Sequence, residues 1–341
     1  MKVKDLEKGW KEIYIESTDD LWYLKNLIDR GSIVAKTVMR REERSDDMER
    51  SKEIPRKPVM VELKPEKVFF QPYTDNLRVQ GIIVSGSEDL QGQHQSMQIS
   101  AKESVELFRE NWQSLSGHIL KEALLRNASE CIFIVMDDEN ALLAELHDYG
   151  IREMVRVPSG KMGKAYQTGY SKIGYFQEIR KALESIKYSG NAIITGPGFE
   201  GPDFYLYMKE NAMPGVTFHQ IPSTREDVGA IYEIIAADEV RKILGDSRLS
   251  REKKFMDAFL EGLGKHKLVS YGLGIVATAA NMGAVSELMV VEEKISDVKV
   301  VNLMDEVMNS GGTVNICSDS SNYHDMVSSF GGILALLRYD I

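Results

Sequence analysis

Three carboxylates at a predicted strand-to-helix junction form the one local group in this sequence that suggests hydrolytic chemistry. They are Glu16, Asp19 and Asp20. Carboxylate oxygens bind hard divalent cations, and such ions assist the cleavage of phosphodiester bonds. Asp19 and Asp20 also lie where the N-terminus of a helix favours negative charge. The sequence therefore leaves two interpretations, a catalytic metal site and a helix cap, and the helix cap is the simpler of the two.

Other common catalytic and metal-binding patterns are absent from the sequence. The six histidines are scattered without an HxxxH or HExxH spacing, and neither a paired Cys motif nor a GxSxG motif occurs. Zinc sites and serine nucleophiles are therefore not expected. Cys131 and Cys317 lie in apolar runs, which predicts buried free thiols and a reducing, cytoplasmic environment.

Two glycine-containing segments have a composition that suits phosphate or partner contacts. Thr195–Phe199 follows a predicted strand, but the chain has no GxxxxGK[ST] motif, and Pro197 lacks the amide that a phosphate nest needs. Ser159–Lys164 carries Lys161 and Lys164 and is either a solvated turn or a lysine contact to a phosphate-rich surface. Neither segment predicts a nucleotide hydrolase.

The charge of the chain restricts how it contacts nucleic acid. A net charge of −10 argues against coating nucleic acid by bulk attraction, so any such contact has to be a local patch. The segment Arg40–Lys57, taken with Lys36, holds eight Lys or Arg and six Asp or Glu. Its basic residues either track a phosphate backbone or belong to a solvated loop of mixed charge. They are Arg40, Arg41, Arg44, Arg50, Lys52, Arg56 and Lys57.

The elements that position these residues begin with a small predicted β-barrel. Short strands with Gly and Pro turns are expected at Lys11–Glu16, Ile33–Met39, Val59–Lys64, Val68–Gln71, Leu77–Val84 and Ser96–Ile99. One helix interrupts them at Asp19–Asp29, with Thr18 or Asp19 as its cap. Gly81 lies inside a strand and predicts a bulge or a sharp bend.

The rest of the chain predicts a linker helix and two α/β segments. Apolar residues recur every three or four positions from Ala101 to Arg126, which favours one long helix. A helix is also expected at Glu226–Leu244, and Gly245–Arg251 interrupts the helical pattern. In the last segment, alternating strands and helices predict a largely parallel sheet. The predicted domains are 1–128, 129–247 and 248–341. No apolar run approaches the roughly 18 residues of a membrane span, and the charged N-terminus is unlike a signal peptide.

Four segments, in order along the whole chain, resemble the Pelota family, which is related to the class-1 translation termination factors. They are DDLWYLKNLI (residues 19–28), QPYTDNLRVQG (residues 71–81), GPGF (residues 196–199) and FGGILALLRY (residues 330–339). The resemblance implies an Sm-like β-barrel followed by two α/β domains, the last similar to ribosomal proteins that bind kink-turn RNA. Two departures weaken residue-by-residue transfer: Glu200-Gly201-Pro202 follow GPGF where basic residues are common, and Gln95 stands where Thr is usual.

The family resemblance also implies a function and partners. Such proteins recognise a ribosome stalled with an empty or mRNA-blocked A site and act with a GTPase of the elongation-factor-1-alpha type. An ABC-type recycling ATPase then takes part in dissociating the ribosome. The chain contains neither the GGQ tripeptide nor the NIKS motif of termination factors, so neither peptidyl-tRNA hydrolysis nor codon reading is expected. A monomer without a cofactor is the corresponding expectation.

The resemblance assigns candidate roles to particular residues and leaves two rival functions open. Contacts to rRNA or mRNA are expected from Lys36, Arg40, Arg41, Arg44, Arg56, Lys57 and Arg78. Contacts to a partner or to the ribosome are expected from Lys161, Lys164, Pro197, Gly198 and Phe199. The first rival is a metal-dependent endoribonuclease in the N-terminal domain, which would use Glu16, Asp19 and Asp20 with a divalent cation. The second is a general RNA-binding adaptor without a preference for ribosomes.

Overall fold

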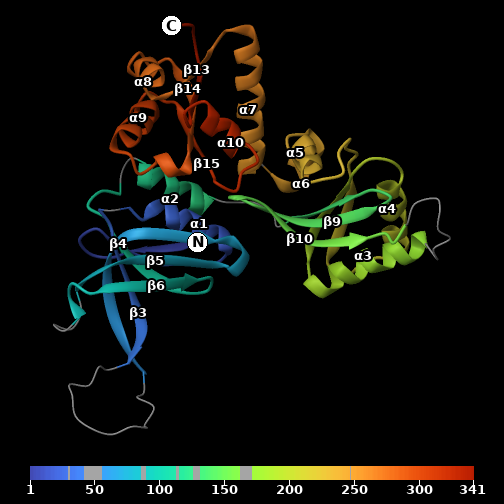
Figure 1. Cartoon of the computed structure of the whole chain (residues 1–341), viewed down its shortest axis with the longest axis horizontal. Helices are drawn as coiled ribbons and strands as arrows, with labels where there is room; N and C mark the ends of the chain where they lie inside the picture. The colour runs from blue at the N-terminus through green and yellow to red at the C-terminus, as the bar shows by residue number, and fades with distance from the viewer. Residues whose placement is uncertain are drawn as a thin grey trace. The chain divides into compact units, whose positions relative to one another are not determined.

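The computed structural model describes residues 1–29, 31–41, 56–85, 90–112, 115–125, 131–161, 171–245 and 247–341, and the side chains of residues 40, 41, 56 and 57 lie outside that description. Two compact units are distinguished: residues 1–126 with 295–305, and residues 127–294 with 306–341 (Figure 1). The division into three domains stays a prediction. Within the described ranges, no helix combines the length and the apolar character that crossing a membrane requires.

The first unit is built on one seven-stranded antiparallel sheet. Its strands are β1 (Lys2–Asp5), β2 (Trp10–Tyr14), β3 (Ile33–Arg41), β4 (Arg56–Gln71), β5 (Asn76–Ser85), β6 (His94–Ser100) and β7 (Ser104–Phe108), in the order β1-β2-β7-β3-β4-β5-β6. Alternate residues of β5 such as Leu77 and Val79 are buried, and this strand contacts α1 (Thr18–Leu27), whose Leu21 and Leu24 are also buried. The predicted strands are therefore confirmed, although two of them merge into β4.

The sheet curls into the predicted barrel. β3 and β6 are three positions apart in the sheet, which in a flat sheet means a separation of about 14 Å. The Lys36 ammonium on β3 nevertheless donates to the backbone oxygen of Gln98 on β6 at 2.6 Å and to Glu103 Oε2 at 2.7 Å. This lysine therefore joins β3 to the free edge of β6.

Gly81 marks the point where the barrel wall bends. The pairing of β4 with β5 shifts register between Pro65 and Lys67, opposite Gly81. A Cβ atom at Gly81 would lie 2.0 Å from the backbone oxygen of Lys64, so only glycine fits between the two backbones. The predicted bulge is confirmed, and its extra residue belongs to β4.

The predicted helix from Ala101 to Arg126 is wrong over its first half. Ser104–Phe108 form β7, which pairs with β2 and β3, and the helix α2 spans only Leu115–Leu125. The residues Val105 and Leu107 are buried at a spacing of two, which is the period of a strand. The predicted cap of the helix near residue 19, Thr18 or Asp19, is also wrong, because Ser17 is the N-cap of α1.

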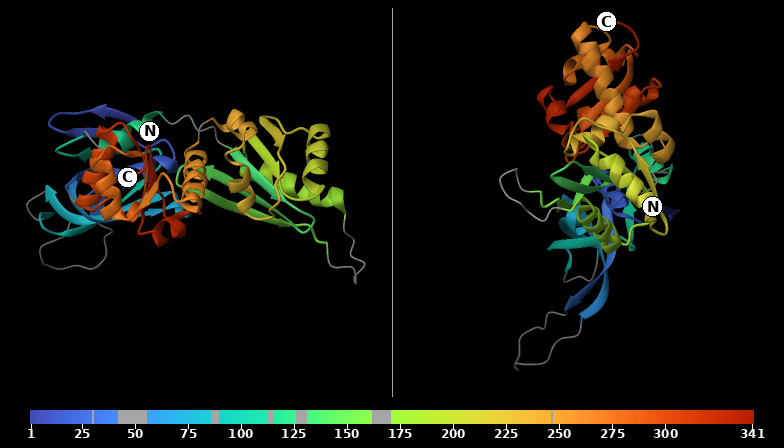
Figure 2. Two further views of the ribbon diagram at one scale, coloured as in Figure 1. Left: turned by 90° about the horizontal axis from the view of Figure 1, so that it is seen from above. Right: turned by 90° about the vertical axis from the view of Figure 1, so that its right-hand side faces the viewer.

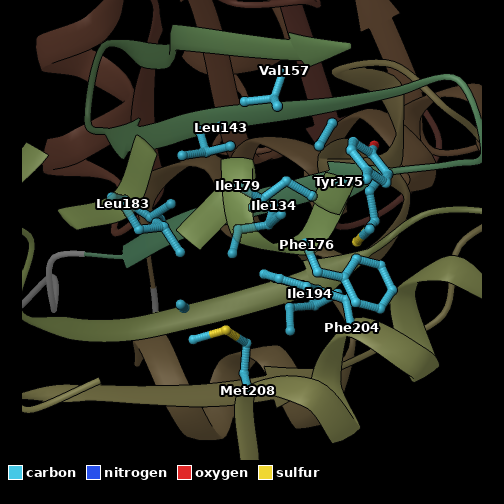
Figure 3. Packing of buried hydrophobic residues seen from close by; sticks show 14 of the residues in the cluster. Ile134, Leu143, Val157, Tyr175, Phe176, Ile179, Leu183, Ile194, Phe204 and Met208 are labelled. Atoms are coloured by element: carbon cyan, nitrogen blue, oxygen red, sulfur yellow. The ribbon is translucent and has the colours of Figure 1, made fainter. Parts of the chain in front are cut away.

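The second unit contains a mixed five-stranded sheet. Its strands are β8 (Cys131–Met136), β9 (Asn140–His147), β10 (Gly150–Pro158), β11 (Gly190–Thr195) and β12 (Val216–Gln220), in the order β10-β9-β8-β11-β12. β11 is parallel to β8 and β12, whereas β9 and β10 are antiparallel. The helices α3 (Lys172–Ile186) and α4 (Glu200–Glu210) close one core around Phe176 and Phe204, whose rings meet edge to face at 5.2 Å (Figure 3).

The predicted helix at Glu226–Leu244 is two short helices, α5 (Gly229–Ile234) and α6 (Asp238–Leu244). Between them Ala237 adopts an extended backbone with ψ near 145°, which ends the helical path. Both helices still turn apolar residues such as Ile231 and Val240 toward a core that includes Phe133. The predicted apolar side of this segment is therefore confirmed, whereas the prediction of one continuous helix is wrong.

The C-terminal part of the second unit has a four-stranded sheet. Its strands are β13 (Val269–Tyr271), β14 (Val285–Val291), β15 (Thr313–Cys317) and β16 (Ile333–Leu337), in the order β13-β16-β14-β15. The helices of this stretch of the chain are α7 (Arg248–Lys265), α8 (Leu273–Asn281), α9 (Val298–Asn309) and α10 (His324–Ser329), and residues 298–305 of α9 are grouped with the first unit. The predicted largely parallel sheet is wrong here, since β16 is antiparallel to both of its neighbours and only β14 and β15 are parallel.

Candidate nucleic-acid interface

The outer halves of β3 and β4 form a two-stranded ribbon that extends past the rest of the barrel. β7 pairs with β3 only over Ile33–Ala35, and β5 pairs with β4 only from Glu62 onward. Residues 36–41 and 56–61 therefore pair only with each other, and the ribbon leaves the barrel in Figure 1 and in the right-hand view of Figure 2. Met39 and Met60 on it are 59% and 44% exposed. An unsupported ribbon with exposed apolar residues is an element that suits contact with another molecule.

The outer end of this ribbon concentrates positive charge. Arg40 pairs with Lys57 in the backbone register, and Arg41 pairs with Arg56. A ribbon whose paired backbone positions carry only basic residue types at its outer end has the composition that suits contact with the phosphates of RNA. The predicted contact Arg44 lies outside the described residues.

The other two predicted RNA contacts in the barrel differ in their accessibility. Lys36 is engaged within the barrel by Gln98 and Glu103 and retains little exposure. Arg78 on β5 is exposed, and its Nε donates to Ser96 Oγ at 2.8 Å. Arg78 is therefore the better placed of the two for an external contact, and the RNA-binding role of both residues stays a prediction.

The carboxylates suggested for metal-assisted cleavage are engaged by ammonium groups. The α-amine of Met1 lies 2.7 Å from Asp20 Oδ2 and 2.9 Å from Glu16 Oε2, and Lys2 Nζ lies 2.9 Å from Glu16 Oε1. Asp20 Oδ2 also accepts from the backbone amides of Glu16 and Ser17 in a capping box. Asp19 is buried in the first turn of α1.

This arrangement gives Glu16 and Asp20 a structural role. Bound ammonium groups already neutralise the two carboxylates, so their donor set does not fit a divalent cation. Across the described ranges, no group of three or more His, Cys, Asp or Glu is arranged to hold a metal ion. The catalytic role of Glu16, Asp19 and Asp20 stays a prediction that these contacts do not support.

The acidic cluster predicts a specific pH dependence. Hydrogen bonds from the Met1 amine and then from Lys2 lower the pKa of Glu16 from 4.5 to about 2. Because the folded pKa lies below the unfolded one, these contacts stabilise the fold above pH 4.5 and lose that effect as the pH falls toward 2. We expect Glu16→Gln to lower the melting temperature at pH 7. We also expect the melting temperature of this variant to fall less steeply than that of the parent as the pH decreases from 4.5 toward 2.

Thermal melts followed by circular dichroism across this pH range would measure the effect. Glu7→Gln is the matched control, since Glu7 is an exposed carboxylate of the same unit, and its side chain forms no ion pair with any residue of the described ranges. Parallel curves for the parent and for Glu16→Gln would contradict a stabilising role of Glu16.

The GPGF segment forms a close-fitting turn with an exposed ring. Gly196 has φ +129°, and a Cβ atom there would lie 2.0 Å from the backbone oxygen of Met136. Phe199 follows at the start of α4 and is 83% exposed. Lys172 of α3 is 2.8 Å from Glu200 and also pairs with Asp203, so it joins the starts of the two helices.

The remaining predicted partner contacts lie near this turn or outside the description. Pro197 is half-buried and Gly198 is exposed, with φ +77°. Lys161 is exposed and pairs with Asp138, and Lys164 lies outside the described residues. The sequence analysis missed Lys172, because its two partners lie about 30 residues further along the chain. It also missed Met39 and Met60, for which the available signal was a strand pattern that continues beyond the residues paired with neighbouring strands.

Comparisons with known proteins agree with this arrangement. Residues 1–124 match the family model of the Pelota N-terminal domain, and residues 249–341 match that of eRF1 domain 3. The fold is shared with Saccharomyces cerevisiae Dom34, described as a translation termination-like factor involved in RNA quality control pathways and interacting with Hbs1, at a TM-score of 0.52 and 18% identity over 100% and 99% of the two chains. The domain matches thus define a chain that combines a Pelota-type N-terminal domain with a domain of the eRF1 domain 3 type.

Full-length relatives make the assignment more specific. The chain is 34% identical over 339 residues to the pelota homolog of Thermoplasma acidophilum, covering 99% of this chain and 98% of that one. The homolog of Picrophilus torridus is 33% identical, with 97% and 96% covered. The crystal structure of the Thermoplasma acidophilum Pelota protein matches over the whole of both chains at a TM-score of 0.81 and 27% identity. The chain belongs to the Pelota family, as its four sequence segments predicted.

Proposed function

We propose that this protein recognises ribosomes stalled with an empty or mRNA-blocked A site and, with a translational GTPase, promotes their release and mRNA surveillance. Membership of the Pelota family supports the general role in ribosome rescue. The observation that carries the more specific role is the ribbon of β3 and β4, whose outer end carries two directly paired sets of basic residues. An A site without tRNA leaves rRNA and mRNA phosphates open to such an element.

The length of the ribbon fits this task. Residues 36–41 span about 20 Å at roughly 3.4 Å per residue, and the ribbon is only two strands wide. A narrow element of this kind can enter a channel that a whole domain cannot. Recognition by shape and charge needs no codon-specific contact, and the chain has no NIKS motif.

The protein is proposed to act by occupancy and partner recruitment. The sequence contains no GGQ tripeptide, so the proposal includes no hydrolysis of peptidyl-tRNA. The GTPase is of the elongation-factor-1-alpha type, and an ABC-type ATPase takes part in dissociation, in the cytoplasm. The interaction of Dom34, which shares this fold, with Hbs1 supports a protein partner. Pro197, Gly198 and the exposed Phe199, with Lys161 and Lys164, are the proposed partner or ribosome contacts.

Co-sedimentation with ribosomes tests the proposal. Ribosomes halted at the end of a truncated mRNA have an empty A site, and ribosomes with tRNA in that site serve as the control. We expect the protein, together with its GTPase and a non-hydrolysable GTP analogue, to bind the first population in preference to the second. Bulk RNA added as competitor should not displace it, whereas displacement would favour a general RNA-binding adaptor. Failure to bind the halted ribosomes at low salt would contradict the proposal.

A further inference from the structure

The outward side of three neighbouring strands of the barrel carries an unusual set of side chains. Directly paired residues of β4, β5 and β6 share a face of the sheet, and the inward residues between them, such as Val79 and Ile99, are buried. We call the outward set the β4–β6 face (strands labelled in Figure 1). Its three cross-strand rows are Lys67–Gln80–Ser96, Phe69–Arg78–Gln98 and Gln71–Asn76–Ser100.

The β4–β6 face contains no acidic residue, although the chain has 52 Asp and Glu and a net charge of −10. The carboxylates at its border already have partners. Glu66 lies 3.3 Å from His94, Asp75 accepts from Thr18 Oγ1 at 2.8 Å, and Glu103 accepts from Lys36. The face therefore offers positive charge and amide groups to a ligand, and carboxylates lie only at its border.

An exposed aromatic ring lies in the middle of this face. Phe69 is 45% exposed and lies directly opposite Arg78, which is itself exposed. The bond from Arg78 Nε to Ser96 Oγ limits the freedom of the guanidinium. A single exposed Phe is ordinary, but a ring beside an arginine and surrounded by Gln and Asn has the composition of a platform for unpaired bases.

We propose that the β4–β6 face binds a segment of single-stranded RNA. One base stacks on Phe69, Arg78 and Lys67 contact phosphates, and the amides of Gln71 and Gln98 bond to base edges. An unpaired strand is required because only an unstacked base exposes its flat side to the ring. The choice of RNA over DNA rests on the proposed function, but the site itself needs no ribosome and is separate from the ribbon.

Fluorescence anisotropy with a labelled 12-nucleotide single-stranded RNA and the full-length protein tests the face. We expect Phe69→Leu, which removes the ring and keeps the apolar bulk, to weaken binding about tenfold, as the loss of one stacked base does. Phe69→Tyr should retain the affinity. Tyr271→Leu is the matched control, because Tyr271 is 43% exposed on β13 in the other unit, and its affinity should equal that of the parent.

Salt dependence separates the ring from the charges. Each phosphate contact on a single strand contributes about 0.7 to the slope of log affinity against log salt. Arg78→Gln and Lys67→Gln should each lower that slope by about this amount, whereas Phe69→Leu should lower the affinity and leave the slope unchanged. Because the ribbon is also basic, RNA binding by the parent protein does not show which surface is used. The differences between the variants and the parent in affinity and in salt slope identify the β4–β6 face.

Two results would overturn the proposal: affinities of Phe69→Leu and of the parent within twofold of each other, or equal binding of a duplex of the same sequence. Equal melting temperatures of parent, Phe69→Leu and Phe69→Tyr ensure that the comparison is made between folded proteins. The assay contains no ribosome, so failure here leaves ribosome recognition by the ribbon standing. Conversely, loss of ribosome binding would not remove a Phe69-dependent affinity for the oligonucleotide.

Discussion

Replacing residues 42–55 with Asn-Gly is expected to slow the splitting of stalled ribosomes at least tenfold and to leave the melting temperature within about 2 °C of the parent. Arg41 and Arg56 are direct partners in the register of β3 and β4, so a two-residue turn can join them. Asn-Gly is the preferred sequence for such a turn, because both of its positions tolerate positive φ. The change shortens what the ribbon presents and keeps the barrel intact.

The measurement is the rate at which subunits separate from halted ribosomes in the presence of the GTPase and the recycling ATPase. A second variant changes Arg40, Arg41, Arg56 and Lys57 to Gln and keeps the length, which separates the effect of charge from that of reach. Unchanged splitting by both variants would contradict the role of the ribbon. A melting temperature several degrees lower in the shortened form would assign residues 42–55 a structural part instead.

The barrel could be predicted from the sequence because its signals are local. Leu77, Val79 and Ile83 alternate with outward residues, and Gly81 stands where only a residue without Cβ fits between β4 and β5. The segment that begins at Ala101 was mispredicted because its apolar residues fit two periods at once. Val105 and Leu107 obey the period of a strand, and pairing with β2 and β3 decided between the two.

The site was harder to predict because its contacts are distant in the chain. Glu16 and Asp20 were correctly placed near a helix start, but their partner, the amine of Met1, is 15 residues from Glu16. The sequence predicts Lys36 as a cation available for RNA, but in the curled sheet its ammonium group donates to Gln98, which is 62 residues away in the chain. The direction of a strand relative to its neighbours also depends on distant parts of the chain. β16 is antiparallel to β14, and the residues of neither strand indicate this direction.

We expect Gly81→Ala to destabilise the first unit by more than about 4 kcal/mol, which is at the extreme of single substitutions. The added Cβ would lie 2.0 Å from the backbone oxygen of Lys64, 2.8 Å from its carbonyl carbon and 3.0 Å from the Pro65 Cα. All three are backbone atoms, so no side chain can rotate away, and β4 and β5 have to separate. β5 lies between β4 and β6, so this separation breaks the middle of the barrel wall.

Urea unfolding followed by circular dichroism would measure this loss. Gly31→Ala is the control in the same unit, because Gly31 is exposed and its added Cβ would come no closer than 3.4 Å to Asp29 Oδ1. That variant should stay within about 0.5 kcal/mol of the parent, as surface substitutions usually do. If Gly81→Ala unfolded at the same urea concentration as Gly31→Ala, β4 and β5 would be able to accommodate a Cβ atom at the bulge. That result would contradict the close packing of the two backbones, and with it the rigid attachment of the ribbon that we propose as a probe.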